Sequence, residues 1–277
     1  MKRSTPGYGI GGVVAVLVIA AFAARGDDPV RPIETPPENS IRVMTWNVNW
    51  GVPGPNQALK VIEKAQADIV CLQETNSAWE KLLRARFAKR YPFMEFRQCT
   101  SAAGGLAYLS RFTGKETAVV PTVTGWFDQW IMSFDTPLGE VQIGNVHLQP
   151  SATDRGQITL TSCLTAAGRR LAETRRFQEK LLPDLPTLVA GDYNENDDDT
   201  SVQLLRRAGM TDALSQFDRS TKTWHWSLGS LNLSARFDHI LYSGLHCYSA
   251  EVIKGGASDH WPVVAVFGRE EKEQNEE

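Results

Sequence analysis

The stretch Leu188-Val-Ala-Gly-Asp-Tyr-Asn194 carries two polar side chains that are one residue apart. The apolar run from Thr187 to Ala190 has the length of a buried strand, and Gly191 ends it. Alternate side chains of an extended segment share a side, so Asp192 and Asn194 are expected to face one point. A carboxylate and a carboxamide there can hold a metal ion, a water molecule or a phosphate oxygen. Because Gly, Asp and Asn are also common in ordinary turns, this stretch alone leaves both interpretations open.

Polar residues stand at the ends of other predicted strands in the same way. Apolar runs and alternating patterns predict strands at 41–48, 68–72, 104–111, 130–134, 140–147, 237–242 and 262–267. The polar residues at or beside the ends of these strands are Asn47, Glu74, His147, Asp238, Asp259 and His260. Each has an ordinary structural explanation, such as an acid in the first turn of a helix for Glu74. Unpaired buried charge is costly, however, and strand ends are where layered α/β folds assemble sites, so the set together predicts one functional site.

Six short motifs resemble the successive motifs of the endonuclease/exonuclease/phosphatase superfamily. They are Thr45-Trp-Asn-Val48, Leu72-Gln-Glu-Thr75, Asn145-Val-His-Leu148, Gly191-Asp-Tyr-Asn194, Arg236-Phe-Asp-His239 and Ser258-Asp-His260. That superfamily includes pancreatic-type deoxyribonucleases, abasic-site endonucleases, inositol-polyphosphate 5-phosphatases and neutral sphingomyelinases. The resemblance covers nearly all of residues 41–268. It implies an α/β (α+β) four-layer sandwich, in which two mixed β-sheets pack face to face and are flanked by helices.

The resemblance also implies roles for the site residues. Asn47, Glu74 and Asp259 are the metal ligands that it implies, for Mg²⁺ or Mn²⁺. The catalytic residues that it implies are His147, Asp192, Asn194, Asp238 and His260. In this scheme Asp192 orients and deprotonates a water, Asn194 holds a phosphate oxygen or the nucleophile, and His260 donates to the phosphate while Asp238 fixes its tautomer. His147 approaches the phosphate from the other side.

One departure concerns His147. In the pancreatic-type nucleases of this superfamily a glutamate supports the corresponding histidine. The matching stretch of this chain, Thr100-Ser-Ala-Ala-Gly104, contains no glutamate. A full acid–base role for His147 therefore stays open.

The sequence predicts four regions along the chain. Residues 1–24 are expected to be a signal peptide or an N-terminal membrane anchor, because Lys2 and Arg3 precede an apolar stretch. That stretch covers about 22 Å as a helix, short of the roughly 30 Å of a bilayer core, and cleavage and anchoring both stay open. A Pro-rich linker at 25–40, the domain at 41–268 and a charged tail at 269–277 follow. The protein is thus expected to be exported, either secreted or periplasmic.

Composition limits the partners. The formal net charge is −3, and it becomes −5 without residues 1–24, which carry Lys2 and Arg3. The sequence has no strongly basic stripe of the kind that would indicate tight, sequence-independent binding of DNA. In an exported protein a disulfide is plausible, and Cys99 with Cys163 is the expected pair, whereas Cys71 is expected in the core.

Polar stretches and runs of charged residues predict loops and helices in the second half of the chain. We expect a long loop at 149–168 and a surface loop at 223–235, and a basic helix at 168–182. Its basic residues, expected on a solvated face, are Arg169, Arg170, Arg175, Arg176 and Lys180. Asp197-Asp-Asp199 is expected to begin a helix rather than to form a calcium loop, which would need a central glycine.

Three functions are compatible with these patterns. The first is an exported, metal-dependent phosphodiesterase that acts as a monomer on a phosphate ester, with nucleic acid as the expected substrate. The second is the same chemistry on a phospholipid or sphingomyelin headgroup, with membrane contact through the N-terminal segment or through Trp224 and Trp226. The third is a binding module that keeps the fold without catalysis.

Overall fold

The structure is a computed structural model that describes residues 30–98, 103–123, 125–152, 159–228 and 230–269. The predicted N-terminal segment 1–24, Cys99 and all but the first residue of the predicted tail lie outside these ranges. Cys163, the expected partner of Cys99, is a free thiol, and Cys71 is a buried thiol as predicted. Within the described ranges, no helix has the length and apolar character needed to cross a bilayer.

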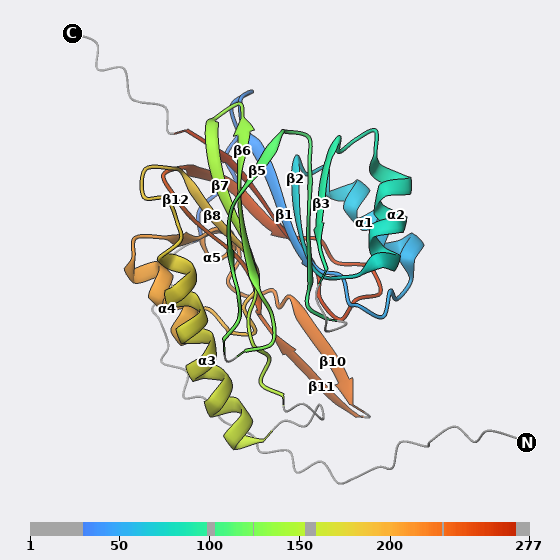
Figure 1. Ribbon diagram of the computed structural model, residues 1–277, viewed down its shortest axis with the longest axis vertical. Coiled ribbons are helices and arrows are strands. Elements are labelled where there is room, and N and C mark those ends of the chain that lie inside the picture. The colour runs from blue at the N-terminus through green and yellow to red at the C-terminus, as the bar shows by residue number, and fades with distance from the viewer. Residues whose placement is uncertain (1–29, 99–102, 124, 153–158, 229, 270–277) are drawn as a thin grey trace, which may run out of the picture.

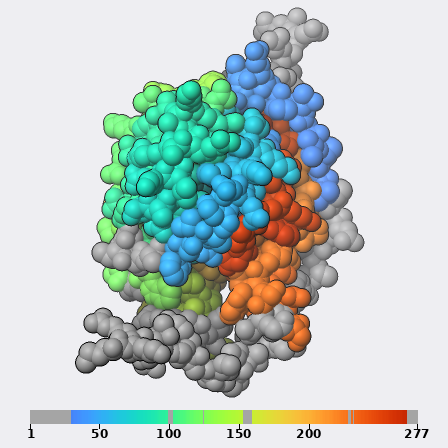
Figure 2. All heavy atoms as spheres, turned by 90° about the vertical axis from the view of Figure 1, so that its right-hand side faces the viewer, coloured from blue at the N-terminus to red at the C-terminus, as the bar shows by residue number. Residues whose placement is uncertain are grey.

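The first sheet has six strands in the order β13-β14-β1-β2-β4-β3. Their bounds are His246–Val252, Val263–Gly268, Ile41–Asn47, Ile69–Thr75, Gly105–Ser110 and Phe93–Arg97. Helices α1 (Pro55–Ala65) and α2 (Ser77–Phe87) cover the outer face of this sheet (Figure 1). Figure 2 shows the blue and teal segment that contains these helices covering much of one side of the molecule.

The second sheet also has six strands, in the order β5-β6-β7-β8-β12-β9. Their bounds are Gly114–Val120, Gln129–Thr136, Gly139–His147, Thr187–Asp192, Asp238–Ser243 and Thr211–Asp212. Helices α3 (Leu160–Gln178) and α4 (Thr200–Arg207) pack on its outer face (Figure 1). The short helix α5 (Ala213–Phe217) contacts β12 and β13. A separate hairpin consists of β10 (Trp224–Leu228) and β11 (Leu231–Ala235).

The main core lies between the two sheets. It joins residues of the first sheet, such as Val43 and Cys71, to residues of the second, such as Ile143 and Leu188. Two further apolar clusters bury the opposite faces of the sheets under the helices. The predicted four-layer sandwich of two mixed sheets flanked by helices is therefore confirmed.

Strand register brings the predicted polar residues together. Strands β7 and β8 are parallel and pair His147 with Asp192, while the antiparallel pair β8–β12 sets Asp238 opposite Asp192. In the other sheet, β1 and β2 are parallel and end together at Asn47 and Gln73. Because β1 packs against β8 across the core, the ends of both sheets meet at one place.

Two predictions of loops are wrong. Residues 160–168, expected in a long loop, form the first half of α3, which a capping box between Thr159 and Ser162 begins. The surface loop expected at 223–235 is the hairpin β10–β11, in which Trp224 pairs with Ala235. The expected helix start at Asp197-Asp-Asp199 is confirmed, since α4 follows directly with Asp199 at its N-cap.

Candidate active site

Glu74 reaches the site through an irregularity of β2. The pairing of β2 with β4 shifts between Gln73 and Thr75, so Glu74 is the extra residue of a β-bulge. Its φ is 60°, in the left-handed region that few residues other than glycine adopt. Such strain persists where the surrounding structure fixes it, often at functional sites. The Trp50 backbone N–H donates to the Glu74 carboxylate at 3.1 Å and helps to fix it.

Asn47 joins the two sheets at the site. Its Nδ2 donates to Glu74 Oε1 at 3.0 Å and to Asp192 Oδ2 at 3.1 Å. Two carboxylate oxygens, one from each sheet, therefore converge on a single nitrogen atom. The Asn47 Oδ1 accepts the Asn49 backbone N–H, which orients the amide.

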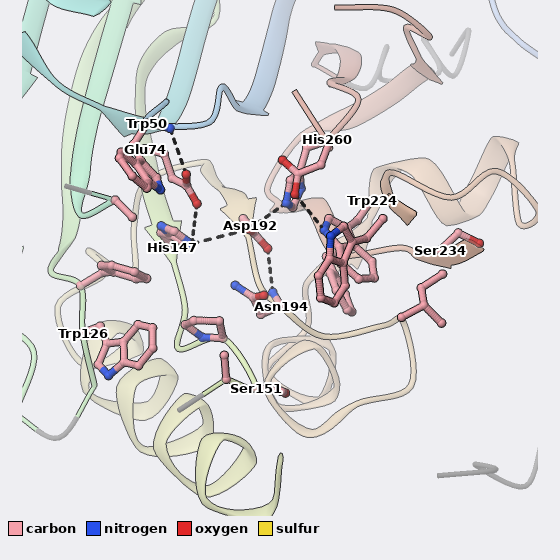
Figure 3. Close-up of a pocket in the computed structure, with 18 residues that line it drawn as sticks. Trp50, Glu74, Trp126, His147, Ser151, Asp192, Asn194, Trp224, Ser234 and His260 are labelled. Atoms are coloured by element: carbon pink, nitrogen blue, oxygen red, sulfur yellow. Dashed lines mark hydrogen bonds and ion pairs between the residues drawn. The ribbon is translucent and has the colours of Figure 1, made fainter. Parts of the chain in front are cut away.

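Asp192 lies at the centre of the predicted set (Figure 3). It is buried, its Oδ1 accepts the Asn194 backbone N–H at 2.8 Å, and its Oδ2 lies 3.6 Å from Nε2 of both His147 and His260. Burial raises the pKa of Asp192, and the charge of His260 opposes this rise. A raised pKa makes a carboxylate a better proton acceptor.

His260 forms a buried pair with Asp238. The Nδ1 of His260 donates to Asp238 Oδ2 at 2.9 Å, which leaves Nε2 directed at Asp192. Burial alone would lower the pKa of His260, but the charges of Asp238 and Asp192 raise it to about 10. The imidazole is therefore a charged hydrogen-bond donor at neutral pH.

His147 lies on the opposite side of Asp192 from His260 (Figure 3). Its ring stacks on Phe127, with the ring centroids 4.1 Å apart, and burial lowers its pKa. Within the described part of the chain, no side chain hydrogen-bonds its Nδ1. No other side chain among these residues thus takes the place of the glutamate that the sequence lacks, while a backbone hydrogen bond of Ala103 partly offsets the lowering of the His147 pKa.

Asn194 and Asp259 border the same cavity. Asn194 has φ 50°, so it reaches the site through a left-handed turn rather than through the extended segment that the sequence predicted. Its side-chain N–H donates to the Leu148 carbonyl. Asp259 accepts hydrogen bonds from Asn49 Nδ2 and Trp224 Nε1, each at 3.2 Å.

The cavity beside these residues has a volume of about 770 Å³. All the predicted site residues line it except Asn47 and Asp238, which act from behind on Asp192 and His260. Sequence reasoning missed Trp50, Trp126 and Phe127. Trp50 directly follows the first motif, whereas nothing in the sequence near Trp126 and Phe127 marked them.

A buried ion pair links the segments next to the site to α3 and α4. Arg170 Nε donates to Glu195 Oε1 at 2.8 Å, and its guanidinium also binds the Gln149 carbonyl and the Ser151 hydroxyl. Glu195 in turn accepts the Ser201 backbone N–H at the start of α4. Arg170 is therefore buried, and the prediction that it lies on a solvated face is wrong. The sequence around Arg170 could not show this, because its partner Glu195 is remote in sequence.

A second buried pair lies behind the site, where Nδ1 of His239 donates to Asp212 Oδ2 at 2.6 Å. With Asp197, these residues form a group whose spacing suits a metal ion, but the atoms already pair with one another. Burial opposes protonation, yet Asp212 raises the pKa of His239 to about 9, while the pKa of Asp212 is lowered despite burial.

This pair predicts how stability depends on pH. Below about pH 6.5, the ordinary pKa of histidine, the protonated His239 makes its full contribution to the free energy of unfolding. This contribution is lost as the pH rises through about 9. We expect the midpoint of urea unfolding to fall between pH 7 and pH 10. In His239→Gln, which cannot titrate, that fall should be smaller. An equal fall in both proteins would show that the pair does not cause it.

The donor atoms at the site fit a hard divalent cation. Burial raises the pKa of both Glu74 and Asp192, which reflects carboxylate charge that is poorly compensated by the protein. Oxygen ligands of this kind suit Mg²⁺ or Mn²⁺. Asp192, Asp238 and His260 also lie within ligand spacing of one another, but the charged His260 already bonds Asp238, so this group is not the expected site. Asn47 turns its amide nitrogen to the carboxylates, so it would serve as a ligand only with its amide turned over.

Comparison with known proteins defines the class. The model of the Endonuclease/Exonuclease/phosphatase family matches residues 44–260. The chain therefore belongs to this family, whose members are hydrolases that act on phosphoester bonds and use divalent metals. No curated protein sequence matched the chain.

Several solved structures share the fold. TDP2 from Caenorhabditis elegans is 20% identical, with a TM-score of 0.63 over 82% of this chain and 75% of that chain. An endonuclease/exonuclease/phosphatase from Beutenbergia cavernae is 19% identical, with a TM-score of 0.65 over 83% and 71%. The human Nocturnin catalytic domain, solved with a bound sulfate anion, is 17% identical, with a TM-score of 0.61 over 83% and 94%. At these identities the similarity shows the fold alone.

Proposed function

We propose that this chain is an exported, divalent-metal-dependent phosphodiesterase of the nuclease type, which cleaves its substrate by attack of an activated water. The observation that supports this most is the setting of Asp192. Its carboxylate lies between two imidazoles, within hydrogen-bond distance of Asn47, at the wall of a cavity. The sulfate bound to Nocturnin, a protein of the same fold, is an anion of the shape of a phosphate.

The roles follow from the charges of the side chains. Asp192 accepts the proton of the attacking water, because its raised pKa and its hydrogen bond from the Asn194 backbone N–H suit a positioned base. The charged His260 donates to a phosphate oxygen, and Asp238 holds its ring in place. His147, whose pKa is lowered, acts as a neutral donor or acceptor on the other side.

Glu74, Asn47 and Asp259 would hold the divalent cation. When bound, the cation offsets the negative charge of the phosphate and of the Glu74 and Asp259 carboxylates. The proposed export rests on residues 1–24 alone, and with it the substrate would be met outside the cytoplasm.

Hydrolysis with and without a chelator tests this function. We expect the purified protein to hydrolyse bis(p-nitrophenyl) phosphate and short oligonucleotides with Mg²⁺ or Mn²⁺. EDTA should abolish turnover and excess metal should restore it, because the carboxylates alone repel the substrate. Turnover that is unchanged in EDTA would contradict the proposal. Metal binding without turnover of any phosphate ester would favour a non-catalytic binding module.

A phospholipid or sphingomyelin headgroup is the second candidate. The observation that favours it is the presence of exposed apolar side chains near the cavity mouth. Trp226, in the cavity wall, is 40% exposed, and Leu160 and Leu164 on the first turns of α3 are 52% and 68% exposed. The start of α3 is bonded to the cavity-lining Ser151 through Ser162. Turnover of sphingomyelin vesicles but not of oligonucleotides would decide for it.

A further inference from the structure

Two aromatic walls border the catalytic residues. The first wall comprises Trp126 and Phe127 from the loop between β5 and β6, and the second wall comprises Trp224, Trp226 and Phe237. Trp126 and Trp224 lie on opposite sides of Asp192 and Asn194 (Figure 3). With Trp50, four of the eight tryptophans of the chain line this one cavity.

Some of these rings are already engaged by the protein. Phe127 stacks on His147, and Trp224 packs on Phe237 at 5.2 Å while its Nε1 donates to Asp259. These contacts hold the inner part of each wall in place. Trp126 is half-buried and Trp226 is 40% exposed, so both keep indole surface that a substrate can cover.

The described lining of the cavity offers little positive charge for a run of phosphates. Among the described residues that line it, none is a lysine or an arginine, whereas Glu74, Asp192 and Asp259 are acidic. Proteins that bind nucleic acid through its backbone place basic side chains along the phosphates. Here the basic side chains among the described lining residues are the imidazoles of His147 and His260, which both face Asp192 and so suit one phosphate.

We propose that the aromatic walls form a stacking subsite for a planar ring of nucleobase type attached to the scissile phosphate. This inference rests on the proposed function and specifies its substrate. The cavity selects a phosphodiester by the ring next to the phosphate rather than by a run of phosphates. Stacking on aromatic side chains tolerates any base, since every base has a π-face. A volume of about 770 Å³ suits a ligand of one or two nucleotides.

A matched pair of substrates tests the subsite. The dinucleotide thymidylyl-(3′→5′)-thymidine and its abasic analogue, with tetrahydrofuran in place of both nucleosides, carry the same single phosphodiester. We expect kcat/KM to be about five- to a hundredfold higher for the dinucleotide, the range expected for stacking of one base.

Trp126→Leu and Trp226→Leu should each lower the ratio of kcat/KM for the dinucleotide to kcat/KM for the abasic analogue several-fold. Val123→Ala, an exposed residue of the same loop as Trp126, is the matched control and should keep it. Equal kcat/KM for the two substrates would overturn the inference while leaving the proposed function intact.

Lengthening the substrate tests the role of the phosphates. Extending the dinucleotide to eight thymidines adds six phosphodiesters and should change kcat/KM per bond by less than about fivefold. A larger rise would show that the enzyme reads a run of phosphates. Faster turnover of phosphatidylcholine vesicles than of the dinucleotide would also overturn the subsite, because it would show that the aromatic walls contact a lipid acyl chain rather than a base.

A binding measurement separates the subsite from catalysis. In calorimetric titrations of the Asp192→Asn protein with Mg²⁺, we expect thymidine 5′-monophosphate to bind at least about fivefold more tightly than glycerol 1-phosphate. Trp126→Leu added to this protein should reduce that preference. Preferential binding by this variant, together with no hydrolysis of the dinucleotide or its abasic analogue by the unsubstituted protein, would refute the proposed function and keep the subsite. No preference would refute the subsite whatever the enzyme hydrolyses.

Discussion

Replacing Asp192 by asparagine will lower kcat/KM for bis(p-nitrophenyl) phosphate by about a thousandfold, the scale of losing a general base. The amide has the shape of the carboxylate and can still accept the Asn194 backbone N–H. It cannot take a proton from water. Burial opposes the charge of Asp192, but the amide NH2 would face the Asn47 Nδ2 donor, so the melting temperature is measured to show that the variant is folded.

Steady-state kinetics and thermal unfolding of the same preparation check this prediction. Asn194→Gly is a useful companion, because it removes the side chain that donates to Leu148, adopts the φ of 50° without strain and leaves the base in place. Its loss should be smaller than that of Asp192→Asn. A loss of less than tenfold in Asp192→Asn would contradict the assignment of the base.

Replacing Arg170 by methionine will lower the free energy of unfolding by about 3–5 kcal/mol, because it leaves the Glu195 carboxylate buried without its partner. For a domain of this size that corresponds to a fall of about 10 °C in the melting temperature. The hydrogen bonds of Arg170 to Gln149 and Ser151 are lost as well. Calorimetric unfolding measures the effect.

Two further variants isolate the charge. In Arg170→Met combined with Glu195→Gln, no buried charge is left over, and an amide oxygen still accepts the Ser201 N–H. The double variant should regain a large part of the loss. Arg175→Met removes an exposed arginine of the same helix and should change stability by less than about 0.5 kcal/mol. Equal effects of Arg170→Met and Arg175→Met would refute the buried pair.

The sheets and the site residues follow from the sequence because each depends on a local pattern. Apolar runs such as Thr187–Ala190 identify buried strands, and polar residues just past them lie at the sheet edge whatever the tertiary details. The order of the motifs along the chain then implied the four-layer fold. For this reason Glu74, His147 and Asp192 could be assigned to one site from the sequence alone.

Features that depend on remote partners could not be predicted. The first half of α3 is polar and resembles a loop in composition, yet packing and the Thr159 cap make it helical. The same holds for Arg170, whose buried state depends on Glu195. The edge strands β3, β5, β9 and β13, which the sequence patterns did not predict, complete the two sheets.

The bulge at Glu74 is a third case. Its left-handed backbone turns the carboxylate toward the other sheet, and no local pattern distinguishes this from an acid at the start of a helix. The aromatic walls likewise come from segments nearly a hundred residues apart, so only the fold shows that they face one cavity.

A crystal soaked in Mn²⁺ tests most directly whether the Glu74 and Asp259 carboxylates share one cation. We expect an anomalous difference peak at the Glu74 carboxylate, at the end of the cavity where Asn47 joins it to Asp192, and no such peak in Glu74→Gln. A peak only at Asp197, Asp212 and His239, or one that persists in Glu74→Gln, would contradict the proposed metal centre.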